Sequence, residues 1–188
     1  MLASTINLMF EETARRSDLP LLQWVLYLLP FAAVLRVQTS AEEMLFLGYL
    51  MQSLAQRFRS WIVWGALPAL VFAVAHWAPG AQPWMNGAVV FSILLFAAVA
   101  VALVWITGNL GAAMGMHFAN NVVALTFLSA SRESEALSLY ITPPIDDPGW
   151  TMGDAVAGVV LQAAMTFAIV WLLASRRSPL RLGGAAPA

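Results

Sequence analysis

Five polar side chains stand out in a chain whose long stretches are otherwise apolar. Two carboxylates, Glu42 and Glu43, begin an apolar segment, and His76 and His117 both lie within apolar segments. An amide, Asn121, follows His117 by one helical turn. A carboxylate can take a proton from water, imidazoles can orient water or bind a metal, and an amide can stabilise an oxyanion. Together these residue types could form a site that hydrolyses a substrate with activated water.

The elements that carry these residues are predicted to be membrane helices. The chain is 61% hydrophobic and only 10% charged, and its mean hydropathy is +0.77. Each ionisable side chain inside a bilayer costs about 2.5–3.5 kcal/mol on insertion scales, so such groups are rare and usually functional. The composition therefore predicts an all-α, polytopic transmembrane helical bundle. A net charge of −1 gives no basic field for nucleic acid, and the absence of cysteine excludes thiolate chemistry.

Three regions are expected along the chain. Residues 1–19 form a polar N-terminal segment, residues 20–175 a single transmembrane domain, and residues 176–188 a basic and then disordered tail. The domain is expected to contain about six membrane-embedded segments, with a polar loop over 129–150 before the last of them. These segments cover residues 20–37, 41–57, 61–77, 87–107, 110–128 and 152–174.

The segment before the carboxylate pair is expected to start a new helix. Gln38, Thr39 and Ser40 supply polar side chains that could cap a helix beginning at Ala41. With six segments, the arginines near both termini and those at 57 and 59 fall on one side of the membrane. By the positive-inside rule that side is cytoplasmic, and both termini are expected there.

Other interpretations of the polar residues remain open at this point. The carboxylates could simply form a capped helix start at the membrane interface, and each histidine could be a satisfied core residue. A small transporter or proton relay would also use intramembrane Glu and His, although the chain shows no internal repeat that favours this. Bringing Glu42, Glu43, His76, His117 and Asn121 together from three helices would let each satisfy the others.

Three ordered motifs resemble those of one protein family. Glu42-Glu43-Met-Leu-Phe-Leu47, Phe72-Ala-Val-Ala-His76 and His117-Phe-Ala-Asn-Asn121 are similar to the patterns EExxxR, FxxxH and HxxxN/D. These patterns belong to the CPBP family of intramembrane proteases, which includes the type II CAAX prenyl endopeptidases and bacteriocin-processing or immunity (Abi) proteins. The resemblance covers a motif core of about residues 38–125.

The resemblance implies an intramembrane endopeptidase that acts on a membrane peptide or a lipidated (CAAX-type or bacteriocin-like) protein. Glu42 would be the general base, Glu43 its supporting acid, and Asn121 the oxyanion group. His76 and His117 would orient water or, with Glu42, bind a divalent metal such as zinc; the site could also work without a metal. The implied location is the lipid bilayer of a bacterial inner membrane.

One position departs from the family pattern. Leu47 stands where the first motif has arginine, a cation one helical turn after Glu43. Arg36, just before the predicted helix, is the nearest alternative cation. The departure leaves a second hypothesis, in which the chain is a catalytically silent family member that acts as a membrane scaffold or immunity protein.

Overall fold

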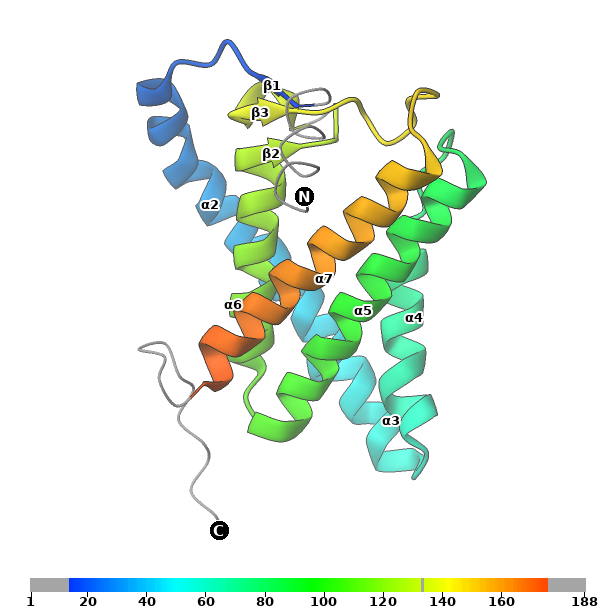
Figure 1. The fold of residues 1–188 in the computed structure, drawn as a ribbon. Coiled ribbons are helices and arrows are strands. Elements are labelled where there is room, and N and C mark those ends of the chain that lie inside the picture. Colours follow the sequence, from blue (N-terminus) through cyan, green and yellow to red (C-terminus); the bar gives the residue numbers. More distant parts are fainter. Residues whose placement is uncertain (1–13, 133, 176–188) are drawn as a thin grey trace.

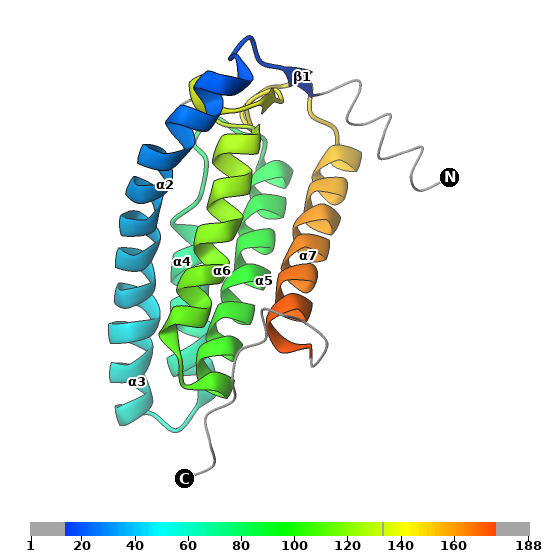
Figure 2. The same cartoon turned by 90° about the vertical axis from the view of Figure 1, so that its left-hand side faces the viewer.

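A computed structural model describes residues 14–132 and 134–175, and over these residues the chain forms a bundle of five helical rods (Figure 1). Figure 2 shows the rods side by side, with the first at one edge, the last at the other, and three between them. The rods are α2–η1–α3 (Leu21–Glu43, Met44–Met51 and Gln52–Arg57), η2–α4 (Ile62–Ala66 and Leu67–Val74), α5 (Pro83–Thr107), α6–η3 (Leu110–Val122 and Val123–Phe127) and α7 (Met152–Ala174).

The surface of the bundle is that of an integral membrane protein. The helices over Leu21–Arg57, Pro83–Thr107 and Met152–Leu172 are long and apolar enough to cross a bilayer. On α2, Leu22, Leu29 and Val37 are each more than 70% exposed. Large apolar side chains at that exposure are unfavourable in water but match hydrocarbon. The all-α membrane class therefore agrees with the structure, and the bilayer is the solvent of this surface.

The prediction of six embedded helices is wrong in one place. Residues 21–57 form one continuous helix of 37 residues rather than two, so no helix starts at Ala41. Thr39 does not cap a helix; its hydroxyl donates to the Leu35 carbonyl at 2.9 Å within the same helix. Inside a bilayer an unbroken helix satisfies its backbone groups without help, whereas a break leaves several unpaired.

This continuity also changes the expected topology. Arg15 and Arg16 lie before the helix and Arg57 ends it, so these arginines are at opposite ends of the bundle and not on one side. Residues 14–19 and the end of α7 likewise lie at opposite ends (Figure 1). The expected placement of both termini on one face is not supported by this arrangement. The tail predicted over 176–188 lies outside the described residues.

The first rod buries one narrow stripe of side chains. Every fourth residue is buried, from Leu35 through Thr39, Glu43 and Leu47 to Met51. In a regular α-helix a spacing of four residues drifts around the axis by about 40° per step. The segment η1, with its wider π-helical turns, offsets that drift and keeps Leu47 and Met51 on the buried side. Glu43 belongs to this stripe and points into the bundle, whereas Glu42 lies at the margin of the bundle.

A small cap replaces the polar loop expected over 129–150. Strand β1 (Arg15–Arg16) pairs antiparallel with β3 (Tyr140–Ile141), which pairs parallel with β2 (Leu128–Ser129). The Ser17 hydroxyl donates to the Ser138 carbonyl at 2.6 Å, and both residues are buried. The segment before the first helix is therefore tied to the connection between α6 and α7.

Candidate functional site

A buried carboxylate–imidazole pair joins the first rod to α6. Oε1 of Glu43 lies 2.8 Å from Nδ1 of His117, and the two side chains are 6% and 5% exposed. The rings of Phe72 and Phe96 stand edge-on to the imidazole, with centroids at 5.7 and 5.6 Å. Because the pair is enclosed by aromatic side chains, each polar partner depends on the other for its hydrogen bond.

The pair defines how His117 faces the second carboxylate. An ionised Glu43 only accepts hydrogen bonds, so Nδ1 of His117 then carries the proton and Nε2 presents a lone pair. Oε2 of Glu42 lies 3.7 Å from that Nε2, which is too long for a direct hydrogen bond; a water molecule placed to the side of the two atoms could contact both. Glu42 is held from the other side by Gln38, whose Nε2 donates to Oε1 at 3.0 Å.

The second histidine belongs to the same region but does not contact this pair directly. Nδ1 of His76 lies 2.8 Å from the Phe72 carbonyl; because a carbonyl only accepts, Nδ1 carries the proton and Nε2 is the free nitrogen. The Phe72 ring lies between the two histidines, with its centroid 4.7 Å from that of His76. His76 is exposed, whereas His117 is buried.

The two histidines line a shared cavity of about 430 Å³. Its polar wall also includes Asn121, together with Asn120 beside it and Gln162 on α7, and most of the remaining lining is apolar. The chain returns to this cavity after His76 through a turn that Asn86 closes. The Asn86 side chain accepts from the Ala78 amide at 2.8 Å and donates to the Ala78 carbonyl at 3.0 Å.

The residues do not form a three-ligand metal site. Within the described ranges, 14–132 and 134–175, no three His, Cys, Asp or Glu side chains lie in positions that could hold a metal ion. Oε2 of Glu42 lies 3.7 Å from Nε2 of His117, and the Nδ1 bond of His76 to the Phe72 carbonyl leaves its Nε2 free, but the three side chains are not gathered into such a group. The expected ligands Glu42, His76 and His117 therefore do not fit a zinc ion, which normally takes three protein ligands and a water.

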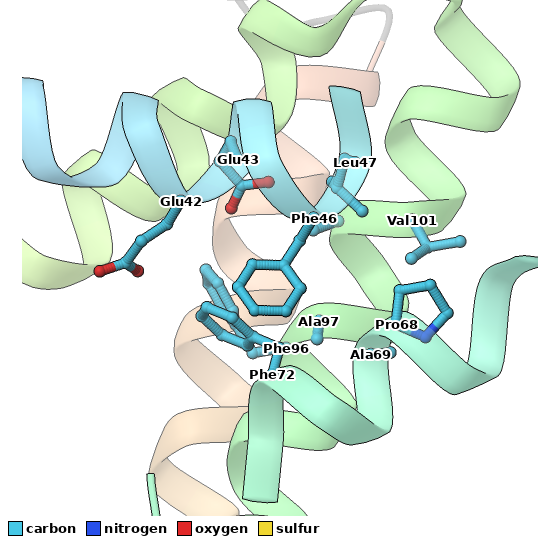
Figure 3. A pocket seen from close by; sticks show the side chains of 11 residues that line it. Glu42, Glu43, Phe46, Leu47, Pro68, Ala69, Phe72, Phe96, Ala97 and Val101 are labelled. Atoms are coloured by element: carbon cyan, nitrogen blue, oxygen red, sulfur yellow. The ribbon is translucent and has the colours of Figure 1, made fainter. Parts of the chain in front are cut away.

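Leu47, at the position where the family motif has arginine, is part of the apolar core. Its side chain is 4% exposed and packs in a cluster with Met51, Phe96 and Met116 among others. Figure 3 shows it beside Glu43, and both line a small cavity of about 20 Å³, room for about one water molecule. No ion pair joins the exposed Arg36 to either carboxylate of the described site. The partner of Glu43 is His117 rather than a cation.

We predict that Leu47→Arg lowers the melting temperature and does not raise any catalytic rate. The new cation would be buried among apolar side chains, and the carboxylate one turn away already binds His117. The matched control is Leu47→Met, which conserves volume and should change little. A rate increase in Leu47→Arg, measured at a temperature where both variants are folded, would show that the wild-type site lacks a needed counter-ion.

Sequence reasoning missed two contributors to the site. Gln162 is a carboxamide in an otherwise apolar span, which is the same signal that identifies Asn121. Phe96 carries no such signal, because one aromatic residue in an apolar helix resembles any other. Of the predicted residues, Glu43 binds His117 directly and Glu42 lies 3.7 Å from it, whereas His76 and Asn121 share only the cavity with His117.

An apolar helical bundle that encloses a carboxylate–imidazole pair beside a cavity defines a membrane protein with an intramembrane polar site. The model of the family described as Type II CAAX prenyl endopeptidase Rce1-like matches residues 20–123, more than half of the chain. This protein belongs to that family, whose members are intramembrane proteases, and the match confirms the resemblance of the three motifs. Neither the curated proteins nor the solved structures give a match.

Proposed function

We propose that this protein is an intramembrane endopeptidase that removes a C-terminal peptide from a lipidated, CAAX-type substrate. The observation that carries the proposal is the placement of His117, which lines the large cavity, between Glu43 at 2.8 Å and Glu42 at 3.7 Å. Both carboxylates line the small cavity, which shares Phe72 and Phe96 with the large one. Membership in a family of CAAX-type endopeptidases supports the reaction class.

The proposed reaction begins with a water molecule that contacts both Glu42 and His117 from one side. Glu42 takes a proton from this water, and the resulting hydroxide attacks the carbonyl carbon of the scissile peptide bond. Glu43 does not touch the water; it fixes the tautomer and orientation of His117, so that the imidazole Nε2 accepts a hydrogen bond from the attacking water. When the C–N bond breaks, the protonated Glu42 returns the proton to the leaving amine.

The negative charge of the tetrahedral intermediate needs donors on the far side of the attacked carbonyl. Asn121 lines the cavity and its amide can supply N–H groups there. His76 lines the same wall, and its Nε2 can donate when the ring is protonated. The apolar remainder of the cavity, including Met85, Ile93 and Val159, suits the lipid or aliphatic side chains of the substrate.

The direct test is cleavage by the purified protein in liposomes. A farnesylated peptide ending in a CAAX sequence is added, and release of the C-terminal tripeptide is followed by mass spectrometry. We expect cleavage of the farnesylated peptide and much less of the same peptide without the lipid. No release from any lipidated peptide, by protein shown to be folded, would overturn the proposal.

We further predict that cleavage survives removal of divalent metals. The reaction above uses only side chains of the chain and a water, because Glu42, His76 and His117 do not form a three-ligand group. Prolonged treatment with EDTA or 1,10-phenanthroline, followed by dialysis, should leave the rate within about twofold, whereas a catalytic metal typically supplies several kcal/mol. A rate that collapses and returns on adding zinc would contradict the metal-free site.

A further inference from the structure

Three side-chain amides form a directional chain along the cavity wall. Nε2 of Gln162 on α7 donates to Oδ1 of Asn120 at 3.0 Å, and Nδ2 of Asn120 donates to Oδ1 of Asn121 at 3.4 Å. All three residues line the cavity that contains the two histidines. These hydrogen bonds therefore run from Gln162 on α7 to Asn121, the residue expected to stabilise the oxyanion.

The direction of these hydrogen bonds determines which end of Asn121 is available. A carboxamide has one carbonyl oxygen, which accepts, and one NH₂ group, which donates. Because Gln162 occupies the oxygen of Asn120, the NH₂ group of Asn120 is the part turned to Asn121. That NH₂ group donates to Oδ1 of Asn121. The NH₂ group of Asn121 is therefore left to donate to a ligand in the cavity.

The first member of the chain is itself anchored. Nε2 of Gln162 also donates to the hydroxyl of Thr166 at 3.3 Å. That hydroxyl donates in turn to the backbone carbonyl of Gln162 at 2.9 Å. Thr166 is 6% exposed. The orientation of the amides is therefore set from α7, which begins at Met152, well beyond the end of the family match at residue 123.

We propose that Gln162 is a positioning residue, which orients Asn120 and through it turns the NH₂ group of Asn121 toward the substrate oxyanion. This inference rests on the proposed endopeptidase function. Without Gln162, Asn120 can rotate by 180° about its terminal bond and offer its oxygen to Asn121, which would then turn its own oxygen toward the cavity. A carbonyl oxygen there repels the developing negative charge.

The first test is a double-mutant cycle in the liposome assay. We expect Gln162→Leu to lower kcat about tenfold with KM changed less than about twofold, because the missing interaction is made only in the transition state. Asn121→Ala should lower kcat by about 10²-fold, as for loss of one oxyanion donor. If Gln162 acts through Asn121, the double variant should be no slower than Asn121→Ala alone, whereas independent effects would multiply.

The matched control is Gln56→Leu, which makes the same replacement at an exposed position on α3. It should leave both kcat and KM unchanged. Full activity in Gln162→Leu, together with a loss in Asn121→Ala, would overturn the positioning role and leave the proposed function intact. Multiplying effects in the double variant would also overturn it.

A second measurement does not depend on activity. In protein labelled with ¹⁵N-asparagine, the side-chain NH₂ signals of Asn120 and Asn121 can be identified by their loss in the Asn→Asp variants. Gln162→Leu should shift both signals, and Gln56→Leu should shift neither. Unshifted signals would overturn the amide chain itself. A wild-type protein that cleaves nothing would overturn the proposed function and with it the role of Gln162 in the reaction, while the NMR signals would still report the hydrogen bonds between the three amides.

Discussion

Replacing Glu42 by glutamine is expected to reduce peptide cleavage by about 10²–10⁴-fold, the range that a general base contributes. Glutamine has nearly the same shape and can still accept the hydrogen bond from Gln38, but it cannot take a proton from water. The Glu42 side chain is 30% exposed at the margin of the bundle, so the melting temperature should hardly change. The assay is tripeptide release from the farnesylated peptide, with thermal unfolding in detergent measured in parallel.

The control for this variant is Glu135→Gln, the same chemical change on the cap. Glu135 pairs with Arg15 at 2.7 Å on the exposed surface and neither residue lines the cavity, and exposed pairs contribute little. We expect normal cleavage in this variant. If Glu42→Gln cleaves as fast as Glu135→Gln and wild type, Glu42 is not the base and the proposed mechanism fails.

Replacing Glu43 should affect both stability and cleavage, unlike Glu42. Glu43→Leu removes the acceptor of His117 Nδ1 and leaves a buried N–H without a partner, which costs about 1–3 kcal/mol of unfolding free energy. Glu43→Gln keeps an oxygen that can accept from Nδ1, so its stability loss should be smaller. Both variants lose the acceptor-only carboxylate that holds the proton of His117 on Nδ1 and leaves Nε2 free to accept from the water, and cleavage should fall on the order of 10²–10⁴-fold.

The comparison of these two variants separates structure from chemistry. Melting temperatures should rank wild type first, Glu43→Gln next and Glu43→Leu last, whereas the cleavage rates of the two variants should both be low. Thermal unfolding and cleavage measured on the same samples provide this comparison. If Glu43→Gln cleaves normally, the charge of Glu43 has no part in the reaction and His117 needs only a hydrogen-bond acceptor.

The sequence indicated the charged and imidazole members of the candidate site, because a charge or imidazole in an apolar segment needs a partner. That reasoning led to Glu43 and His117, which lie 74 residues apart in the chain yet form a hydrogen bond. It could not show which pairs meet. His76 and His117 both lie in apolar segments of the sequence, but His76 binds a backbone carbonyl and His117 binds a carboxylate.

The fold was predictable in class and less so in connectivity. Polar residues at 38–40 resemble a helix start, yet in a membrane their side chains can bond within the helix, as Thr39 does, so the helix continues. The small sheet of the cap was not predictable at all. Its strands have two residues each, and an alternating pattern cannot be recognised over so short a length.

The short helix over Ile62–Val74 has a consequence for water. At about 1.5 Å per residue its 13 residues (62–74) cover about 20 Å, roughly 10 Å less than the hydrocarbon thickness of a typical bilayer. The irregular backbone that follows it, with His76, therefore lies at a depth where peptide groups cannot face lipid and are tolerated only against protein or a water-filled space. His76 opens onto the cavity. The hydrophobic mismatch of one short helix thus favours a hydrated cavity beside His76, and this cavity would bring the water that the proposed hydrolysis consumes to a site inside the membrane.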